Sequence, residues 1–255
     1  MFQPHSLPWH YLWVAPNLLL AVLGGALWKQ GLHREFRGFF LYCCFQALQC
    51  AILYPLDLIT SIPGSYFWRV YWASLLVESI VVLVVISDLF ADVFGSYAAL
   101  SHLGRRLIRG GGTLLLIVAT AVGAHASKDF YYWFIPASHA VQEMMYIVVS
   151  GLMLLLFAAA GYFRLAWNHR VFGIALGLGI SACVHLATWA VAANGGLADR
   201  RYLLDMANMA TTHVVVLMWF YYMLIPQRTI GKSVVELPEN NLALWNRELE
   251  RLLQQ

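Results

Sequence analysis

The sequence contains few charged residues. Only 11% of its 255 residues are Asp, Glu, Lys or Arg, and 61% are hydrophobic, whereas a soluble domain carries about 25% charged residues. The mean hydropathy is +0.66. A soluble chain of this length could not bury so much apolar surface, so the composition excludes a soluble globular protein. The formal net charge of +3 is also too small to indicate nucleic-acid binding.

The sequence also contains only four cysteines, and no two of them have the C-x-x-C spacing of a redox or zinc motif. All of the cysteines fall inside apolar runs rather than in loops, which favours small packing residues over a disulfide framework. No basic segment precedes the first apolar run, so we expect that run to be an anchor rather than a cleaved signal. The four residues are Cys43, Cys44, Cys50 and Cys183.

Seven apolar runs dominate the chain. Each reaches the roughly 20 residues that a bilayer core of about 30 Å requires. The sequence therefore predicts an all-α polytopic membrane protein, with a seven-transmembrane-helix bundle over residues 1–228 and a cytosolic tail over residues 229–255. The predicted spans are 10–28, 38–60, 67–93, 108–127, 131–163, 171–194 and 203–225.

The distribution of lysine and arginine predicts the orientation. Positive residues accumulate on the cytosolic side of membrane proteins. The connectors after odd-numbered spans, together with the tail, hold twelve of them: Lys29, Arg34, Arg37, Arg105, Arg106, Arg109, Arg164, Arg170, Arg228, Lys232, Arg247 and Arg251. The other side holds four: Arg69, Lys128, Arg200 and Arg201. We therefore expect the N-terminus outside and the C-terminus in the cytosol.

The tail contains one amphipathic pattern. Pro238 and Asn241 are typical of a helix start, and apolar residues then recur at helical spacing over residues 241–253. We expect this helix to bind the lipid bilayer, the underside of the bundle, or a partner protein, including a second copy of the chain. Its apolar residues are Leu242, Trp245, Leu249 and Leu252.

Several apolar runs carry polar or ionisable residues. A charged group in hydrocarbon costs about 2.5–3.5 kcal/mol on insertion scales, so such residues normally face a protein interior. At about 1.5 Å per helical residue, five ionisable members fall at a similar depth. They predict a polar pocket open to the outside, although private hydrogen bonds to neighbouring helices remain the alternative. The predicted pocket residues are Glu78, His139, Gln142, Glu143, His185, Asn208 and His213.

Two functions fit this pattern. His139, Glu143, His185 and His213 would suit zinc or another transition metal, and a metal-bound water would hydrolyse a lipid amide or ester. However, the sequence has neither H-x-x-x-H nor H-E-x-x-H. A small-ligand sensor or an accessory subunit needs only the polar pocket and the cytosolic tail, and it needs no cofactor. We favour this non-enzymatic interpretation and keep the metal-dependent membrane hydrolase as the alternative.

Several short stretches of the first 110 residues form a recognisable series. They are LWVAP at 12–16, GLHREF at 31–36, FFLY at 39–42, FQ at 45–46, YF at 66–67, YW at 71–72, YAAL at 97–100 and LG at 103–104. This series resembles a group of uncharacterised bacterial seven-span membrane proteins. The resemblance implies a seven-span topology and a bacterial cytoplasmic (inner) membrane, but no activity. Where we expect an acidic residue flanked by Tyr and Ile, this chain has Ser87-Asp88-Leu89-Phe90.

Overall fold

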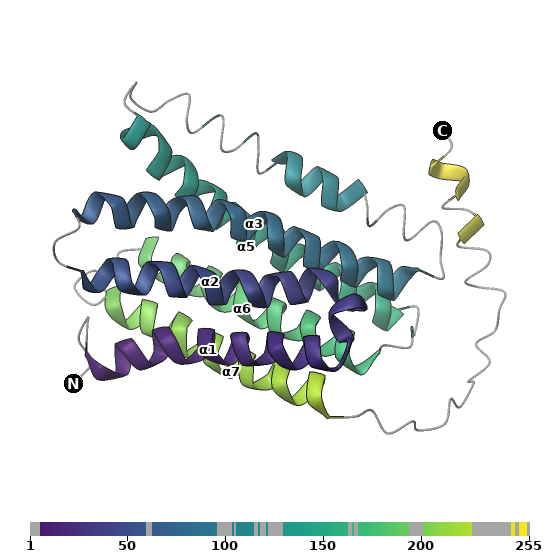
Figure 1. The fold of residues 1–255 in the computed structure, drawn as a ribbon. Coiled ribbons are helices and arrows are strands. Elements are labelled where there is room, and N and C mark those ends of the chain that lie inside the picture. The colour runs from purple at the N-terminus through teal and green to yellow at the C-terminus, as the bar shows by residue number, and fades with distance from the viewer. Residues whose placement is uncertain are drawn as a thin grey trace.

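The structure is a computed structural model in which the described residues are helical apart from short connecting segments (Figure 1). The helices are α1 (Leu7–Lys29), η1 (Leu32–Arg34), α2 (Arg37–Leu58), α3 (Gly64–Phe94), α5 (Phe130–Tyr162), α6 (His169–Ala193) and α7 (Arg201–Leu224). It describes residues 6–59, 63–95, 104, 106–114, 117, 121, 130–162, 165, 168–193, 201–225, 246–247 and 250–253, without the side chains of 130–137, 139, 193 and 201.

Six of these helices are long and apolar enough to cross a membrane. Their ends agree with six of the predicted spans to within three residues, because hydropathy defines where an apolar run stops. The chain is thus a multi-pass helical membrane protein by helix length and composition. For the predicted span at 108–127, residues 106–114, 117 and 121 are helical and the others lie outside the described residues, so the seventh span stays a prediction.

The six long helices form a closed ring. Each packs against its neighbour in the order α1, α2, α3, α5, α6 and α7, and α7 then packs against α1. α3 also contacts α6 across the middle of the ring. The ring arrangement directs the inward side chains of every helix towards one shared core.

The helices of the ring alternate in direction except at two contacts, α3–α5 and α7–α1, where the neighbours run parallel. Gly24 faces Cys43 across the α1–α2 contact, Gln46 faces Glu78 across α2–α3, and both pairs are antiparallel. α1, α3, α5 and α7 all begin at one end of the bundle, here called the N end, and finish at the other, the C end (Figure 1).

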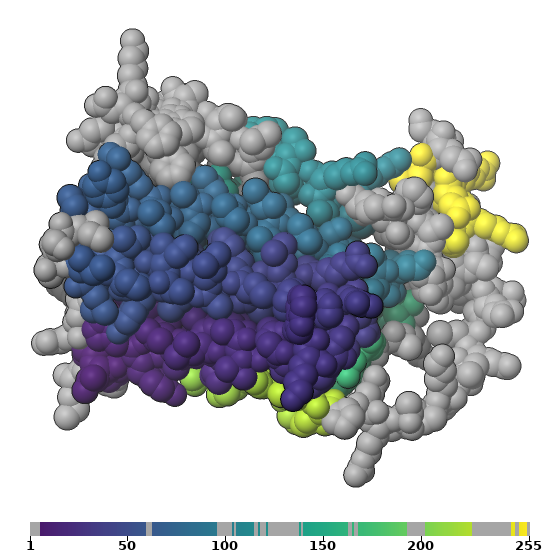
Figure 2. Space-filling model, viewed as in Figure 1, coloured from purple at the N-terminus to yellow at the C-terminus, as the bar shows by residue number. Residues whose placement is uncertain are grey.

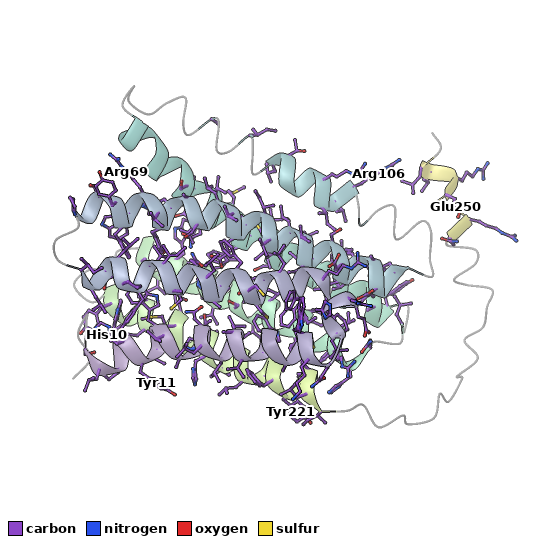
Figure 3. The ribbon with its side chains drawn as sticks, in the orientation of Figure 1. His10, Tyr11, Arg69, Arg106, Tyr221 and Glu250 are labelled. Atoms are coloured by element: carbon purple, nitrogen blue, oxygen red, sulfur yellow. The ribbon has the colours of Figure 1, made fainter. Side chains whose placement is uncertain are left out.

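Because α3 finishes at the C end and α5 begins at the N end, the chain between them has to return along the bundle. The described part of that connection follows such a course. Gly104 lies beside Phe90 near the end of α3, whereas Gly112 lies beside Leu83, two turns further back. Arg106 lies towards the C end (Figure 3). This segment lies outside the ring, against α3 and α5.

The tightest packing is in the C half of the ring. The twelve largest fully buried side chains all lie in the half of their helix that is nearer the C end. Close packing of this kind resists deformation, so the C half is the rigid part of the bundle. The residues are Leu20, Leu23, Leu27, Phe39, Val85, Ile86, Leu89, Met153, Leu156, Ile174, Trp219 and Met223.

Glycines allow α6 and α7 to approach closely in this half. Gly173 packs against the Tyr222 ring and Gly177 against the indole of Trp219, because small residues let two helices approach closely. The Trp219 Nε1–H donates a hydrogen bond to the Gly173 carbonyl oxygen at 3.1 Å. The same indole packs edge-on against Phe39 of α2, so Trp219 joins three helices.

The cysteines differ in their surroundings. All four are free thiols. Cys43 and Cys50 are buried, as predicted for packing residues. Cys44 and Cys183 are exposed on the outside of the ring; for these two the prediction is wrong, because a span in a ring of single helices turns part of its circumference outward.

The tail is described at Asn246–Arg247 and at 250–253, and these residues are helical. Leu252 is exposed. The other three apolar residues of the predicted tail helix lie outside the described residues. Burial of its apolar face against the bilayer or a partner stays a prediction.

Candidate functional site

Polar side chains recur in the middle and the N half of the ring. On four helices they follow the spacing i, i+3 or i+4, and i+7, and on α5 the spacing i, i+4, which places them on one face of each helix. Most are half-buried, in contrast to the fully buried apolar side chains of the C half. The polar series are Tyr42, Gln46 and Gln49 on α2; Tyr71, Ser74 and Glu78 on α3; Gln142 and Tyr146 on α5; Ser181, His185 and Thr188 on α6; and Asp205, Asn208 and Thr212 on α7.

Hydrogen bonds connect the polar faces of α2 and α3. The Gln46 amide donates to Glu78 Oε1 at 2.6 Å. One turn nearer the N end, the Gln49 amide donates to Ser74 Oγ at 2.7 Å. Ser74 in turn donates to the Tyr71 carbonyl oxygen. Gln46 and Gln49, which follow Tyr42 by four and seven residues, thus join α2 to α3 by hydrogen bonds in addition to apolar packing.

Three phenols surround the Glu78 carboxyl group. Tyr42, Tyr71 and Tyr146, from α2, α3 and α5, each lie near enough to interact with it electrostatically. The Tyr146 ring stacks on the His185 imidazole of α6, with ring centres 4.4 Å apart. Groups from α2, α3 and α5 therefore converge on Glu78, which faces the interior of the ring, and α6 joins this cluster through the contact of His185 with Tyr146.

The His185 ring has a defined protonation pattern. Its Nδ1 lies 2.9 Å from the Ser181 carbonyl oxygen, and a carbonyl can only accept, so Nδ1 carries a proton. In the neutral ring this leaves Nε2 as an acceptor. The Ser181 carbonyl oxygen and the Tyr146 ring together fix the orientation of the imidazole.

The second carboxylate, Glu143, has a different partner. Its Oε1 accepts a hydrogen bond from Trp189 Nε1 of α6 at 2.5 Å, and Trp189 is largely exposed. Nearby, Thr188 donates to Asn208 Oδ1 of α7 at 3.1 Å. These contacts bind α5 to α6 and α6 to α7 along their N halves.

The predicted pocket residues are divided among several contacts. Glu78 bonds Gln46, Glu143 bonds Trp189, and His185 stacks on Tyr146. His213 lies against the Tyr11 ring of α1, with ring centres 5.5 Å apart, and Figure 3 shows Tyr11 near the start of α1. Gln142 donates weakly to the Tyr146 hydroxyl at 3.4 Å. The side chain of His139 lies outside the described residues, so one pocket lined by the whole predicted set stays a prediction.

The possible metal ligands are not assembled by the described residues. Among the described residues, no group of three or more His, Cys, Asp and Glu side chains could hold a metal ion. The predicted ligand set includes His139, whose side chain is not among them. The metal site therefore also stays a prediction.

Most of the residues around Glu78 were not among those predicted from the sequence to line a pocket. Tyr42, Gln46, Tyr71 and Tyr146 were not identified, because each is a common residue in a membrane span when taken alone. The signal that could have found them is their spacing: each lies three, four or seven residues from another polar residue of its own helix. No known protein family, curated protein or solved structure matches the chain.

Proposed function

We propose that this multi-pass membrane protein is a sensor or accessory subunit that binds a small cationic ligand in the N half of the ring, at Glu78. One observation carries the proposal. Glu78 faces the ring interior among the side chains of Gln46 and Gln49 and three phenols. Among the described residues, no lysine, arginine or histidine forms an ion pair with it.

The chemistry of the surrounding groups favours a cation. A carboxylate in a membrane interior is costly and is normally paired with an opposite charge. Aromatic rings such as those of the three tyrosines attract cations over their faces, particularly amines and quaternary ammonium groups. The Gln46 amide donates to Glu78 Oε1 and the Gln49 side chain also hydrogen-bonds the carboxyl group, so two amides hold it in place. A small organic amine fits this combination better than an anion or a neutral sugar.

The packing of the bundle favours sensing over catalysis. The C half is rigid and apolar, whereas the N half is joined by hydrogen bonds between half-buried side chains. A ligand that pulls α2, α3 and α5 together at Glu78 would change the angles of these helices about the packed C half. The displacement would then reach the C end, from which the tail continues.

We also propose a membrane topology for the chain. Seven crossings, with the N end outside and the tail in the cytosol of a bacterium, would account for the return of the chain between α3 and α5. They would also account for the excess of lysine and arginine at the C end. A pocket in the N half would then be open to ligands from outside the cell.

Thermal stability of the purified full chain in detergent tests the ligand. A ligand that binds only the folded state stabilises it by about 2.7 kcal/mol at 100 times its Kd. We expect primary and quaternary amines to raise the melting temperature, and alcohols of the same carbon skeleton to have no effect. Glu78→Gln should abolish the increase. Glu143→Gln is the matched control, because it makes the same change at another glutamate of the spans, and it should retain the increase.

Two results would contradict the proposal. Either no amine stabilises the wild-type chain, or Glu78→Gln responds to amines as the wild type does. The hydrolase alternative has its own measurement. Stoichiometric zinc in the purified protein that is lost on His213→Ala would establish a metal site and favour the enzyme.

A further inference from the structure

An apolar groove of about 260 Å³ runs along the outside of the ring between α1 and α2. On α1 it extends from Leu20 to Trp28, and Phe40 and Cys44 of α2 form its other wall. Two glycines on α1 make the space. A Cβ on Gly25 would meet no atom within 4 Å, so any larger side chain there would project into the groove. α1 and α2 lie side by side on the face seen in Figure 2.

A basic turn closes the C end of the groove. α1 finishes at Lys29, and Gly31, with a left-handed φ of 73°, turns the chain into η1. Left-handed backbone is strained for other residues, so glycine permits this turn. It returns His33 onto the groove wall, where the imidazole stacks on Trp28 with ring centres 4.5 Å apart. Lys29 and Arg34, both exposed, therefore flank the mouth of the groove.

The acidic residues of this region are directed towards α3. Asp88 accepts a hydrogen bond from the Gly38 amide at 2.9 Å, at the start of α2. Asp92 interacts electrostatically with Asp88 and with Glu35 of the turn. These carboxylates therefore gather on the α2–α3 side, opposite the α1–α2 groove. The mouth of the groove is left with an excess of positive charge.

We propose that this groove binds an anionic glycerophospholipid, with one acyl chain along α1 and the phosphate at Lys29 and Arg34. The groove spans nine residues of helix, from Leu20 to Trp28, about 12 Å. Its volume is below the roughly 300–1,000 Å³ of pockets for drug-sized ligands, which suits a single narrow chain. Tryptophan and basic residues mark the level of lipid headgroups, and Trp28 with Lys29 supplies both at one end. The site is independent of the pocket at Glu78.

Filling the groove tests the acyl-chain site. The full chain would be placed in nanodiscs containing equal amounts of phosphatidylglycerol and phosphatidylcholine, and the retained lipid counted by native mass spectrometry. We expect retained phosphatidylglycerol on the wild type and its loss on Gly25→Leu. Gly151→Leu on α5 is the matched control, since Gly151 is also exposed and a Cβ there also meets nothing within 4 Å.

Removing charge tests the headgroup site. Lys29→Gln and Arg34→Gln should each reduce the preference for phosphatidylglycerol by about fivefold and leave retained phosphatidylcholine unchanged. The same changes at Arg106 and Arg109, which are exposed elsewhere, should have little effect. Lys29 and Arg34 are exposed rather than packed, so their variants test the phospholipid site even if Gly25→Leu does not fold.

Three outcomes would overturn the proposal. The first is equal retention of both lipids on the wild type. The second is loss of phosphatidylglycerol on Gly151→Leu to the same extent as on Gly25→Leu. The third is a dimer of the chain that disappears on Gly25→Leu, which would assign the groove to a second copy.

Discussion

The α6–α7 contact makes a quantitative prediction for Gly177→Ala. The added methyl group would overlap the Trp219 indole nitrogen, and it would lie 2.7 Å from Trp219 Cε2 and 2.9 Å from Val215 Cγ1. Trp219 has little freedom to move away. It is 2% exposed, is hydrogen-bonded to Gly173 and packs on α2. We therefore expect Gly177→Ala to destabilise the folded protein.

The magnitude follows from three contributions. Overpacking a close-packed site costs about 1–3 kcal/mol. If the indole shifts and its N–H loses the Gly173 carbonyl, the unsatisfied donor costs about 1–3 kcal/mol more. Alanine in place of glycine inside a helix returns about 1 kcal/mol. The net loss in free energy of unfolding should be about 1–5 kcal/mol.

The assay is equilibrium unfolding of the full chain in mixed micelles, with helix content measured by circular dichroism. Gly151→Ala is the matched control, because the same change is made where the Cβ has open space. It should leave stability unchanged or increase it by up to about 1 kcal/mol. The double variant Gly177→Ala with Trp219→Phe should show coupling, because the smaller ring relieves the overlap. If Gly177→Ala is as stable as Gly151→Ala, the close contact between α6 and α7 is refuted.

Two further predictions concern the start of α2 and the topology. Asp88→Ala should lower stability by about 1–2 kcal/mol, because the Asp88 carboxylate accepts from the Gly38 amide and so caps the start of α2 from another helix. Ser87→Ala is the control. Equal melting temperatures for the two variants would show that this hydrogen bond contributes nothing to stability. A cytosolic reporter should be active when fused after Gln255 and inactive when fused after Ile59 at the N end of α2, and the same signal at both sites would contradict an odd number of crossings.

The helix ends were predictable from the sequence because hydropathy changes sharply at the membrane boundary. The partners of each helix were not. Depth along the bilayer follows from counting residues, but the direction in which a side chain points around its helix axis depends on the neighbours. Glu78 and Glu143 were placed at similar depth, yet one bonds α2 and the other α6. Gly177 packs against Trp219, and nothing in a single sequence identifies that side chain as its neighbour.

The order of helices around the ring has a consequence for biosynthesis. Every helix from α2 onward packs against the one that was made just before it, with the 106–114 segment lying outside. α1 waits longest for its second neighbour, because that neighbour is α7, the last of the six long helices in chain order. Until α7 is made, α1 and α6 would each present an unmatched flank to lipid, including Gly173 and Gly177 on α6. The contact between α1 and α7 is thus the point at which a cell could distinguish a chain that contains α7 from one truncated before it.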